Sequence, residues 1–166
     1  MKSHYSLLFL LAFLSTQTAN ASTIFVTSTA DNGPGTLRQA LATPADGDII
    51  DATGVSGTIL LTSGELVVSK SVTVLGPGYA NLSVDGNAAD RVFIFQSNLG
   101  SISGLSIVRG GGGGIWNDAT LTVSNCITSG NSVLNVYGDN FAGGRGVFNA
   151  GSAEIINSTI SDDQVQ

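Results

Sequence analysis

The chain has 166 residues, of which 42% are hydrophobic, 11% are charged and 22 are glycine. This composition excludes an intrinsically disordered chain, which needs low hydrophobicity and high charge density. The formal net charge of -6 argues against a nucleic-acid-binding protein, because affinity for phosphate depends on clustered Lys and Arg. Cations and neutral polymers remain as ligand classes for a folded, glycine-rich protein.

The first 21 residues have the pattern of a secretory signal peptide. Lys2 supplies the basic residue of the N-terminal region, and residues 7–14 form the apolar run. Residues 19–21 (ANA) have the small-x-small form of a signal-peptidase site. The run is shorter than the roughly 20 apolar residues of a membrane-spanning helix, and no second run of that length follows. We expect export and a mature chain that begins at Ser22, without a transmembrane segment. An uncleaved anchor is the alternative.

Cleavage of this leader would remove His4, the single histidine of the chain. A Ser-His-Asp triad, a Cys-His nucleophile and a His-ligated zinc or iron site would then lack a required group. Cys126 is the single cysteine, which excludes an intramolecular disulfide and a thiolate metal cluster. We expect Cys126 to be a small buried hydrophobe on a strand. An intermolecular disulfide or a reactive thiol is the alternative.

Short segments rich in Val, Ile, Leu, Thr and Phe follow the leader. They are separated by Gly, Asn, Asp and Pro, and such spacing is typical of all-β proteins. The expected strands are 23–27, 58–62, 66–69, 71–75, 82–85, 91–96 and 104–108. The sequence therefore predicts an all-β fold.

One short helix is expected just after the first strand. Thr36 and Gln39 have the spacing of a capping box. The apolar positions that follow recur at i, i+3 and i+4 on one stripe, and they are Leu37, Ala40 and Leu41. A single helix in a chain of strands is suited to cover an exposed apolar end, which a solenoid requires.

The second half contains an internal repeat with an offset of 32 residues. Residues 114–117 (GIWN) recur as 146–149 (GVFN), and residues 123–126 (VSNC) recur as 155–158 (IINS). A repeat predicts stacked structural units, and a regular β-helix coil takes roughly 20 to 25 residues. A loop over residues 131–143 accounts for the additional length.

Aligned asparagines occur in both copies of the repeat. Asn117 aligns with Asn149, and Asn125 aligns with Asn157. Stacked side-chain amides can donate to the coil above and accept from the coil below, so we expect two amide ladders. The alternative is that these asparagines only tolerate the left-handed geometry of a turn, which fits the same fold.

Four segments carry a resemblance to a known family: 31–41 (DNGPGTLRQAL), 57–59 (GTI), 75–78 (LGPG) and 112–117 (GGGIWN). They resemble the start of secreted bacterial proteins of the pectate-lyase-like superfamily. The resemblance implies a right-handed, single-stranded parallel β-helix with a short N-terminal capping helix. Related repeats occur in surface adhesins, autotransporter passengers, polymorphic outer-membrane proteins and carbohydrate-active enzymes, so the implied architecture is more specific than the implied activity.

The expected organisation has three parts. A signal peptide (1–21) precedes an N-terminal cap (22–56), and β-helix coils (57–166) follow, with about six coils in all. Residues 161–166 follow a strand and contain no recognisable cap. We therefore expect an open final coil, in a truncated product, a fragment or a protein that stacks on a partner.

We expect no catalytic, cofactor-binding or metal-binding residue in this chain. The glycine run 110–114 is interpreted as a tight turn, because no Lys-Ser/Thr follows it. Residues 46–48 (DGD) and 85–87 (DGN) give weak support for Ca²⁺, and an ordinary role in turns is preferred. Asp162 and Asp163 resemble a catalytic carboxylate pair, but no cleft-forming coil follows them.

Basic and aromatic side chains provide the remaining candidates. A lyase needs a basic residue beside Ca²⁺-binding carboxylates, and the available residues are Arg91, Arg109 and Arg145. Aromatic rings that could stack on sugars belong to Trp116, Tyr137 and Phe148. For Trp116 and Phe148 we prefer an internal stack between successive coils.

The sequence predicts an exported, non-catalytic β-helix module of a secreted or cell-surface, adhesin-like protein. Its flat sides would present a binding or structural surface to a polysaccharide or another cell-surface ligand. Its open end would pair with further coils or with a second copy. The alternative is a polysaccharide lyase or glycoside hydrolase, or an inactive remnant of one. A cleft with three or more convergent carboxylates and a nearby Arg or Lys would favour the enzyme.

Overall fold

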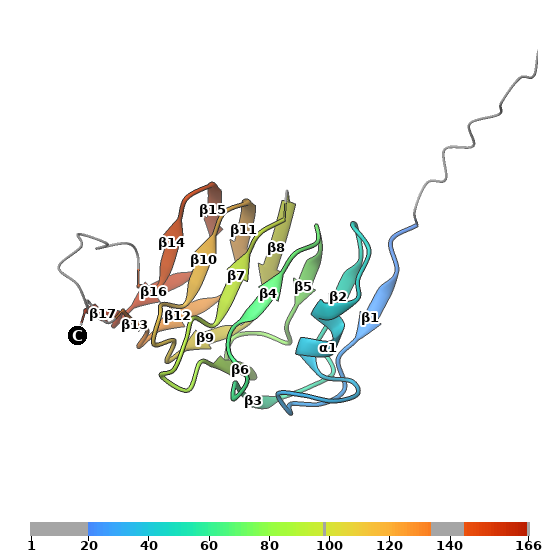
Figure 1. Ribbon diagram of the computed structural model, residues 1–166, viewed down its shortest axis with the longest axis horizontal. Coiled ribbons are helices and arrows are strands. Elements are labelled where there is room, and N and C mark those ends of the chain that lie inside the picture. The colour runs from blue at the N-terminus through green and yellow to red at the C-terminus, as the bar shows by residue number, and fades with distance from the viewer. Residues whose placement is uncertain (1–19, 98, 134–144, 166) are drawn as a thin grey trace, which may run out of the picture.

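The computed structural model describes residues 20–97, 99–133 and 145–165. Most of the predicted signal peptide, most of the predicted loop 131–143 and Tyr137 lie outside the described residues. The described chain forms a β-solenoid of about four turns with parallel strands and one short helix. The coils are stacked along the long axis of the molecule (Figure 1). The predicted parallel β-helix with a short N-terminal helix is confirmed.

Three parallel sheets form the sides of the solenoid. The six-stranded sheet contains, in spatial order, β1 (Thr23–Phe25), β2 (Ile49–Asp51), β5 (Thr73–Leu75), β8 (Leu99–Ser103), β11 (Thr120–Ser124) and β15 (Ser152–Ile156). The four-stranded sheet contains β14 (Val147–Asn149), β10 (Ile115–Asn117), β7 (Phe93–Phe95) and β4 (Leu66–Val68). The five-stranded sheet contains β16 (Thr159–Ser161), β12 (Ile127–Ser129), β9 (Ser106–Val108), β6 (Leu82–Asp85) and β3 (Gly57–Leu60). A further short pair consists of β13 (Ser132–Val133) and β17 (Gln164–Val165).

The internal repeat is confirmed, but the expected number of coils is wrong. Strand β10 pairs with β14 so that residues 115–117 lie beside residues 147–149, at the predicted offset. Leu99 lies beside Thr120 and Thr120 beside Ser152, so one coil takes 21 residues and the next takes 32. The solenoid has about four turns, fewer than six, because the cap and the long last coil use residues that regular coils would need.

Inward-facing side chains form columns along the interior. Side chains alternate between the two faces of a strand, and Ile50, Val74 and Ile102 occupy equivalent inward positions with 0% exposure. Phe95 of β7 is also fully buried. A Cβ atom at Gly100 would lie 2.8 Å from the Phe95 ring, so glycine at this position makes room for the aromatic side chain.

Helix α1 (Leu37–Ala42) lies at the N-terminal end of the solenoid (Figure 1). The Thr36 hydroxyl accepts a hydrogen bond from Gln39 N, as the predicted capping box requires. The Gln39 side chain accepts from Gly35 N, one residue earlier than in the standard box. The apolar stripe is buried and the helix packs on β4 and β2. No helix in the described ranges has the length and apolarity needed to cross a membrane.

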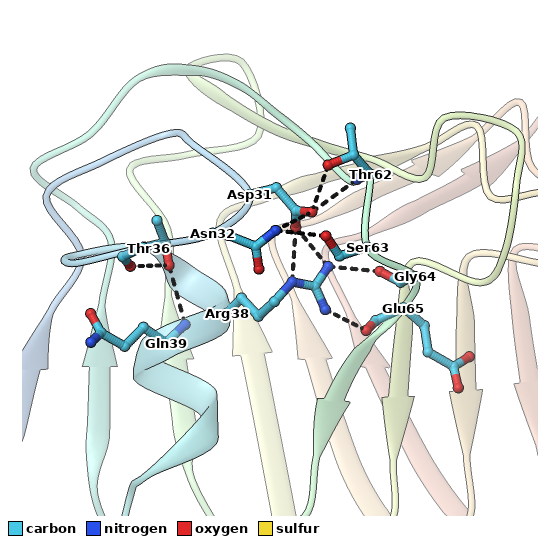
Figure 2. A network of polar contacts seen from close by, with 10 residues as sticks. Asp31, Asn32, Thr36, Arg38, Gln39, Thr62, Ser63, Gly64 and Glu65 are labelled. Atoms are coloured by element: carbon cyan, nitrogen blue, oxygen red, sulfur yellow. Dashed lines mark hydrogen bonds and ion pairs between the residues drawn. The ribbon is translucent and has the colours of Figure 1, made fainter.

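Asp31 and Arg38 join the cap to the first coils (Figure 2). Asp31 Oδ1 accepts from Arg38 Nε at 2.9 Å and Nη2 at 2.6 Å, while Oδ2 accepts from Thr62 N and Oγ1 at 3.0 Å. Arg38 also donates to the carbonyl oxygens of Glu65 at 2.8 Å and Gly64 at 2.7 Å. The planar guanidinium thus binds one carboxylate and two backbone carbonyls at once.

Acid is expected to weaken this contact. Burial disfavours the charged carboxyl of Asp31, but hydrogen bonds from Thr62 and Arg38 outweigh burial and lower its pKa from 3.8 to about 2. Since the pKa is lower in the folded state, the stabilisation is complete above roughly pH 4 and is lost as the pH falls towards 2. We expect Asp31→Asn to flatten the pH dependence of the unfolding free energy in this window, measured by urea denaturation. An unchanged slope in Asp31→Asn would contradict this result, and Asp46→Asn serves as the exposed control.

Candidate functional site at the open coil

The last coil, made of β14, β15 and β16, is termed the open coil. Each of its strands is the edge of its sheet. Inward positions that are buried one coil below are exposed here, since Val123 is 1% exposed and the equivalent Ile155 is 43% exposed. All five residues of β15 are exposed. Within the described residues, the expected open end is therefore a surface of inward-facing side chains and free strand edges.

A hollow of about 450 Å³ lies where β14 begins and β16 ends. Its lining residues are Arg145, Gly146, Val147, Ile160, Ser161, Asp162 and Asp163. The structure thus brings the predicted carboxylate pair together with one of the three candidate arginines. This is the strongest group of candidate functional side chains in the described chain.

Asp163 is held by the coil below it. Its Oδ1 atom accepts hydrogen bonds from Asn131 N at 2.8 Å and from Asn131 Nδ2 at 3.0 Å. Asn131 is fully buried, and its own Oδ1 accepts from Gly110 N at 2.8 Å. Successive coil corners are thereby joined by a ladder that the sequence analysis missed. The signal was present, because Asn131 and Asp163 have the same offset of 32 as the repeat.

The corner of the open coil contains unsatisfied polar atoms. Burial raises the pKa of Asp163 and the neighbouring charge of Asp162 adds to this effect, while Asn131 and Arg145 oppose it. The buried Oδ2 atom of Asp163 has no hydrogen-bond partner among the described residues. The same holds for the buried hydroxyl of Thr128 on β12. Buried polar atoms are normally paired, so these two atoms are an exception in the described chain.

One of the two predicted amide ladders is present. Asn117 Nδ2 donates to Asn149 Oδ1 at 2.6 Å, and Asn117 Oδ1 accepts from Ala119 N at 3.0 Å. The second ladder is wrong, because no hydrogen bond joins the side chains of Asn125 and Asn157. Their φ angles are 52° and 47°, so they occupy the left-handed turn positions of the alternative interpretation.

The predicted aromatic stack forms, but not in the interior. The ring centroids of Trp116 and Phe148 are 4.0 Å apart at an interplanar angle of 26°. Because β10 buries Ile115 and Asn117, alternation places Trp116 on the outer face, where it is half-buried. The guanidinium of Arg91, from the coil below, lies 4.6 Å from the Trp116 ring. Arg91 and Phe148 therefore cover the two faces of the indole, which leaves no free face for stacking on a sugar.

The oxygen-rich turns use their carboxylates on the backbone. Asp48 accepts hydrogen bonds from Ser22 N and Ala45 N, each at 2.8 Å, and these bonds lower its pKa. Asp85 accepts from Asn87 N at 2.8 Å. Both segments form turns, and these contacts direct their carboxylates at backbone N–H groups.

The other two candidate arginines form ion pairs on the sides of the solenoid. Arg91 Nη1 lies 3.0 Å from Glu65 Oε2, and Arg109 Nε lies 3.0 Å from Asp85 Oδ1. The two pairs lie on different coils, since Arg91 precedes β7 and Arg109 follows β9. Each of these arginines therefore has a single carboxylate partner instead of a shared acidic cluster.

Two further sequence candidates have structural roles. Cys126 is 1% exposed, as expected, but it lies in the corner between β11 and β12 instead of on a strand. Burial raises the pKa of its thiol. The glycine run 110–114 is the predicted turn, with Gly113 at a φ of 106° and Val92 N donating to the carbonyl of Gly113.

In the described part of the chain, no three His, Cys, Asp or Glu side chains form a group that could hold a metal ion. The acidic residues are distributed over separate turns, as the contacts of Asp31, Asp48 and Asp85 illustrate. Comparisons with protein-family models, curated proteins and solved structures find no match for this chain.

Proposed function

We propose that this chain is an exported, non-catalytic β-helix module of a secreted or cell-surface, adhesin-like protein. The parallel β-helix agrees with the resemblance to the pectate-lyase-like superfamily, in which both adhesins and enzymes use this architecture. The proposed export depends on the signal-peptide pattern of residues 1–21. Many of the aspartate carboxylates accept hydrogen bonds from the protein's own backbone, and this favours the binding module over the enzyme.

Seven aspartates each accept a hydrogen bond from a backbone N–H group: Asp31, Asp46, Asp48, Asp51, Asp85, Asp90 and Asp163. A carboxylate in such a contact stabilises the local backbone conformation, because one of its oxygens is bonded to a backbone N–H group of the same chain. Acid–base catalysis on a polysaccharide needs two carboxyl groups that face the substrate at a defined separation. These seven side chains therefore serve the fold.

The outer face of the six-stranded sheet offers a regular surface for binding. Thr73, Ser101 and Thr122 occupy one outward row on successive coils, and Ser103 and Ser124 occupy the next row. Their hydroxyl groups can both donate and accept hydrogen bonds. A flat array of neutral hydroxyls suits a neutral polymer or a surface glycan better than a charged ligand.

We expect the purified chain to release no product from pectin, pectate or related polymers, with or without added Ca²⁺. Unsaturated and reducing ends would be measured against a buffer blank, with an active pectate lyase as positive control. Binding to the same polymers would be measured in parallel for the native chain and for Thr122→Val, which removes one hydroxyl of the row. We expect binding by the native chain and weaker binding by this variant.

The open-coil hollow makes the enzyme alternative testable with the same preparation. Asp162 is exposed there and lies beside Arg145 and Asp163. Product release by the native chain that is abolished in Asp162→Asn would overturn the non-catalytic proposal. Product release that is equal in both chains would show that Asp162 is not the catalytic group.

A further inference from the structure

The two ends of the solenoid leave different strands free. At the N-terminal end, helix α1 packs on β4, and Asp31 accepts a hydrogen bond from Thr62 N, just after β3. Only the six-stranded sheet continues beyond these contacts, through β1. At the opposite end, all three sheets finish in a strand of the open coil, and β13 and β17 form a separate pair. Figure 1 shows this asymmetry between the helix-bearing end and the end formed by β14, β15 and β16.

We propose that a second copy of this chain covers the open coil, forming a head-to-head dimer with two-fold symmetry. Ile155 and Ile160 are 43% and 46% exposed although their equivalents one coil below, Val123 and Thr128, are 1% exposed. Burial of such apolar surface drives association. The edge strands at the N-terminal end are β1, β3 and β4, and helix α1 packs on β4, so a head-to-tail copy could not pair its β4 with β14.

The two-fold axis crosses β15 and the corner that holds the hollow. Rotation about this axis pairs β15 with β15 of the second copy in antiparallel orientation, and it places β14 over β16. Val147 and Ile160 both occupy inward positions, equivalent to Ile115 and Thr128 in the coil below. In the dimer, Val147 of each copy therefore meets Ile160 of the other and closes the interior.

The charges at the hollow are complementary under the same rotation. Arg145 precedes β14, whereas Asp162 and Asp163 follow β16, so the axis brings Arg145 of one copy to the two carboxylates of the other. This contact occurs twice in a two-fold dimer. The exposed carboxylate of Asp162 is the acceptor for this guanidinium, because the Oδ2 atom of Asp163 is buried.

The register of the β15 pair follows from Glu154. A pairing centred on Glu154 would place two carboxylates directly opposite each other, which destabilises an antiparallel pair. A shift that centres the pair on Ile155 keeps the inward residues facing inward and places Glu154 opposite Ile156. The preferred register therefore brings the two Ile155 side chains together.

The oligomeric state of the full chain, expressed with its leader in a secreting host, tests the proposal. Sedimentation velocity should give twice the chain mass, with a dissociation constant that rises with salt because the corner contacts are ionic. Arg145→Glu should weaken the dimer by at least about tenfold, as should Asp162→Lys, because each change places like charges together. A 1:1 mixture of Arg145→Glu and Asp162→Lys should recover the dimer, since the reversed charges match across the heterodimer.

A disulfide identifies the arrangement. In a Cys126→Ala background, Ile155→Cys should form a covalent dimer under mild oxidation, because opposite residues of an antiparallel pair lie within disulfide reach. Glu154→Cys should not form a covalent dimer, because residue 154 of one copy lies opposite residue 156 of the other and not opposite residue 154. A native chain that is monomeric at all concentrations would overturn the proposal. Open-ended growth with concentration, or crosslinking at position 154 but not at 155, would also contradict the head-to-head dimer.

Discussion

Replacement of Arg38 by alanine should lower the free energy of unfolding by about 3 kcal/mol. The Arg38 side chain is 22% exposed and its partner Asp31 is 6% exposed, so water compensates little for the lost cation. Alanine leaves the Asp31 carboxylate partly buried without its ion pair, and it leaves the carbonyls of Gly64 and Glu65 without donors. Because these contacts join the cap to the coils, we expect α1 to separate from β4 early in unfolding.

Arg109→Ala is the matched control for this prediction. Arg109 forms a similar ion pair with Asp85, but its side chain is 56% exposed. Exposed pairs contribute less than about 1 kcal/mol, so the loss should be small. Arg38→Lys should lie between the two, because an ammonium keeps the charge but cannot bind as a planar fork. Urea denaturation followed by Trp116 fluorescence gives all three values, and equal losses in Arg38→Ala and Arg109→Ala would refute the prediction.

Replacement of Asn117 by alanine should cost about 2–4 kcal/mol of unfolding free energy. Asn117 is fully buried, and its Nδ2 atom donates to Asn149 Oδ1 and to the carbonyls of Ala119 and Ser152. Its Oδ1 atom accepts from Ala119 N. Alanine leaves these groups unpaired and opens a void between two coils, and both effects destabilise the folded chain.

Two further variants separate these effects. Asn117→Asp preserves the shape and the acceptor but removes the amide donor, so it should be as destabilising as alanine if hydrogen bonds dominate. Asn81→Ala removes an exposed amide that donates to the Pro77 carbonyl, and it should cost less than about 1 kcal/mol. Thermal and urea denaturation measure the differences. A value for Asn117→Ala as small as that for Asn81→Ala would show that the ladder contributes little.

Local pattern was enough for most elements up to residue 108. Each of the seven predicted strands is found, mostly one to three residues shorter or shifted by one residue, and the helix begins where its capping residue predicts. The first missed strand, β2, contains Ile49 and Ile50 between aspartates that are typical of turns. The second, β8, contains Gly100, which weakens the strand signal but makes room for Phe95. Strand propensity is local, whereas these two strands form because the neighbouring coils pair with them.

The candidate site could be predicted only in part. Asp162, Asp163 and Arg145 were all identified as candidates, but chain order does not show that they meet at one corner. Their meeting depends on the length of the last coil, which places residue 163 over residue 131. Coil lengths differ from turn to turn, so a regular period could not have located the corner.

The sequence by itself determined the class of fold, the position of the capping helix and the pairing of the two repeat copies. These features follow from strand and helix periodicity and from a shared offset, which are properties of the chain alone. Tertiary structure decided which face of each strand is inside. Alternation shows that Ile115 and Asn117 share one face and Trp116 has the other, but it does not show which face is buried. The interior accepts Asn117 because neighbouring coils satisfy its amide, and Trp116 lies outside between Arg91 and Phe148.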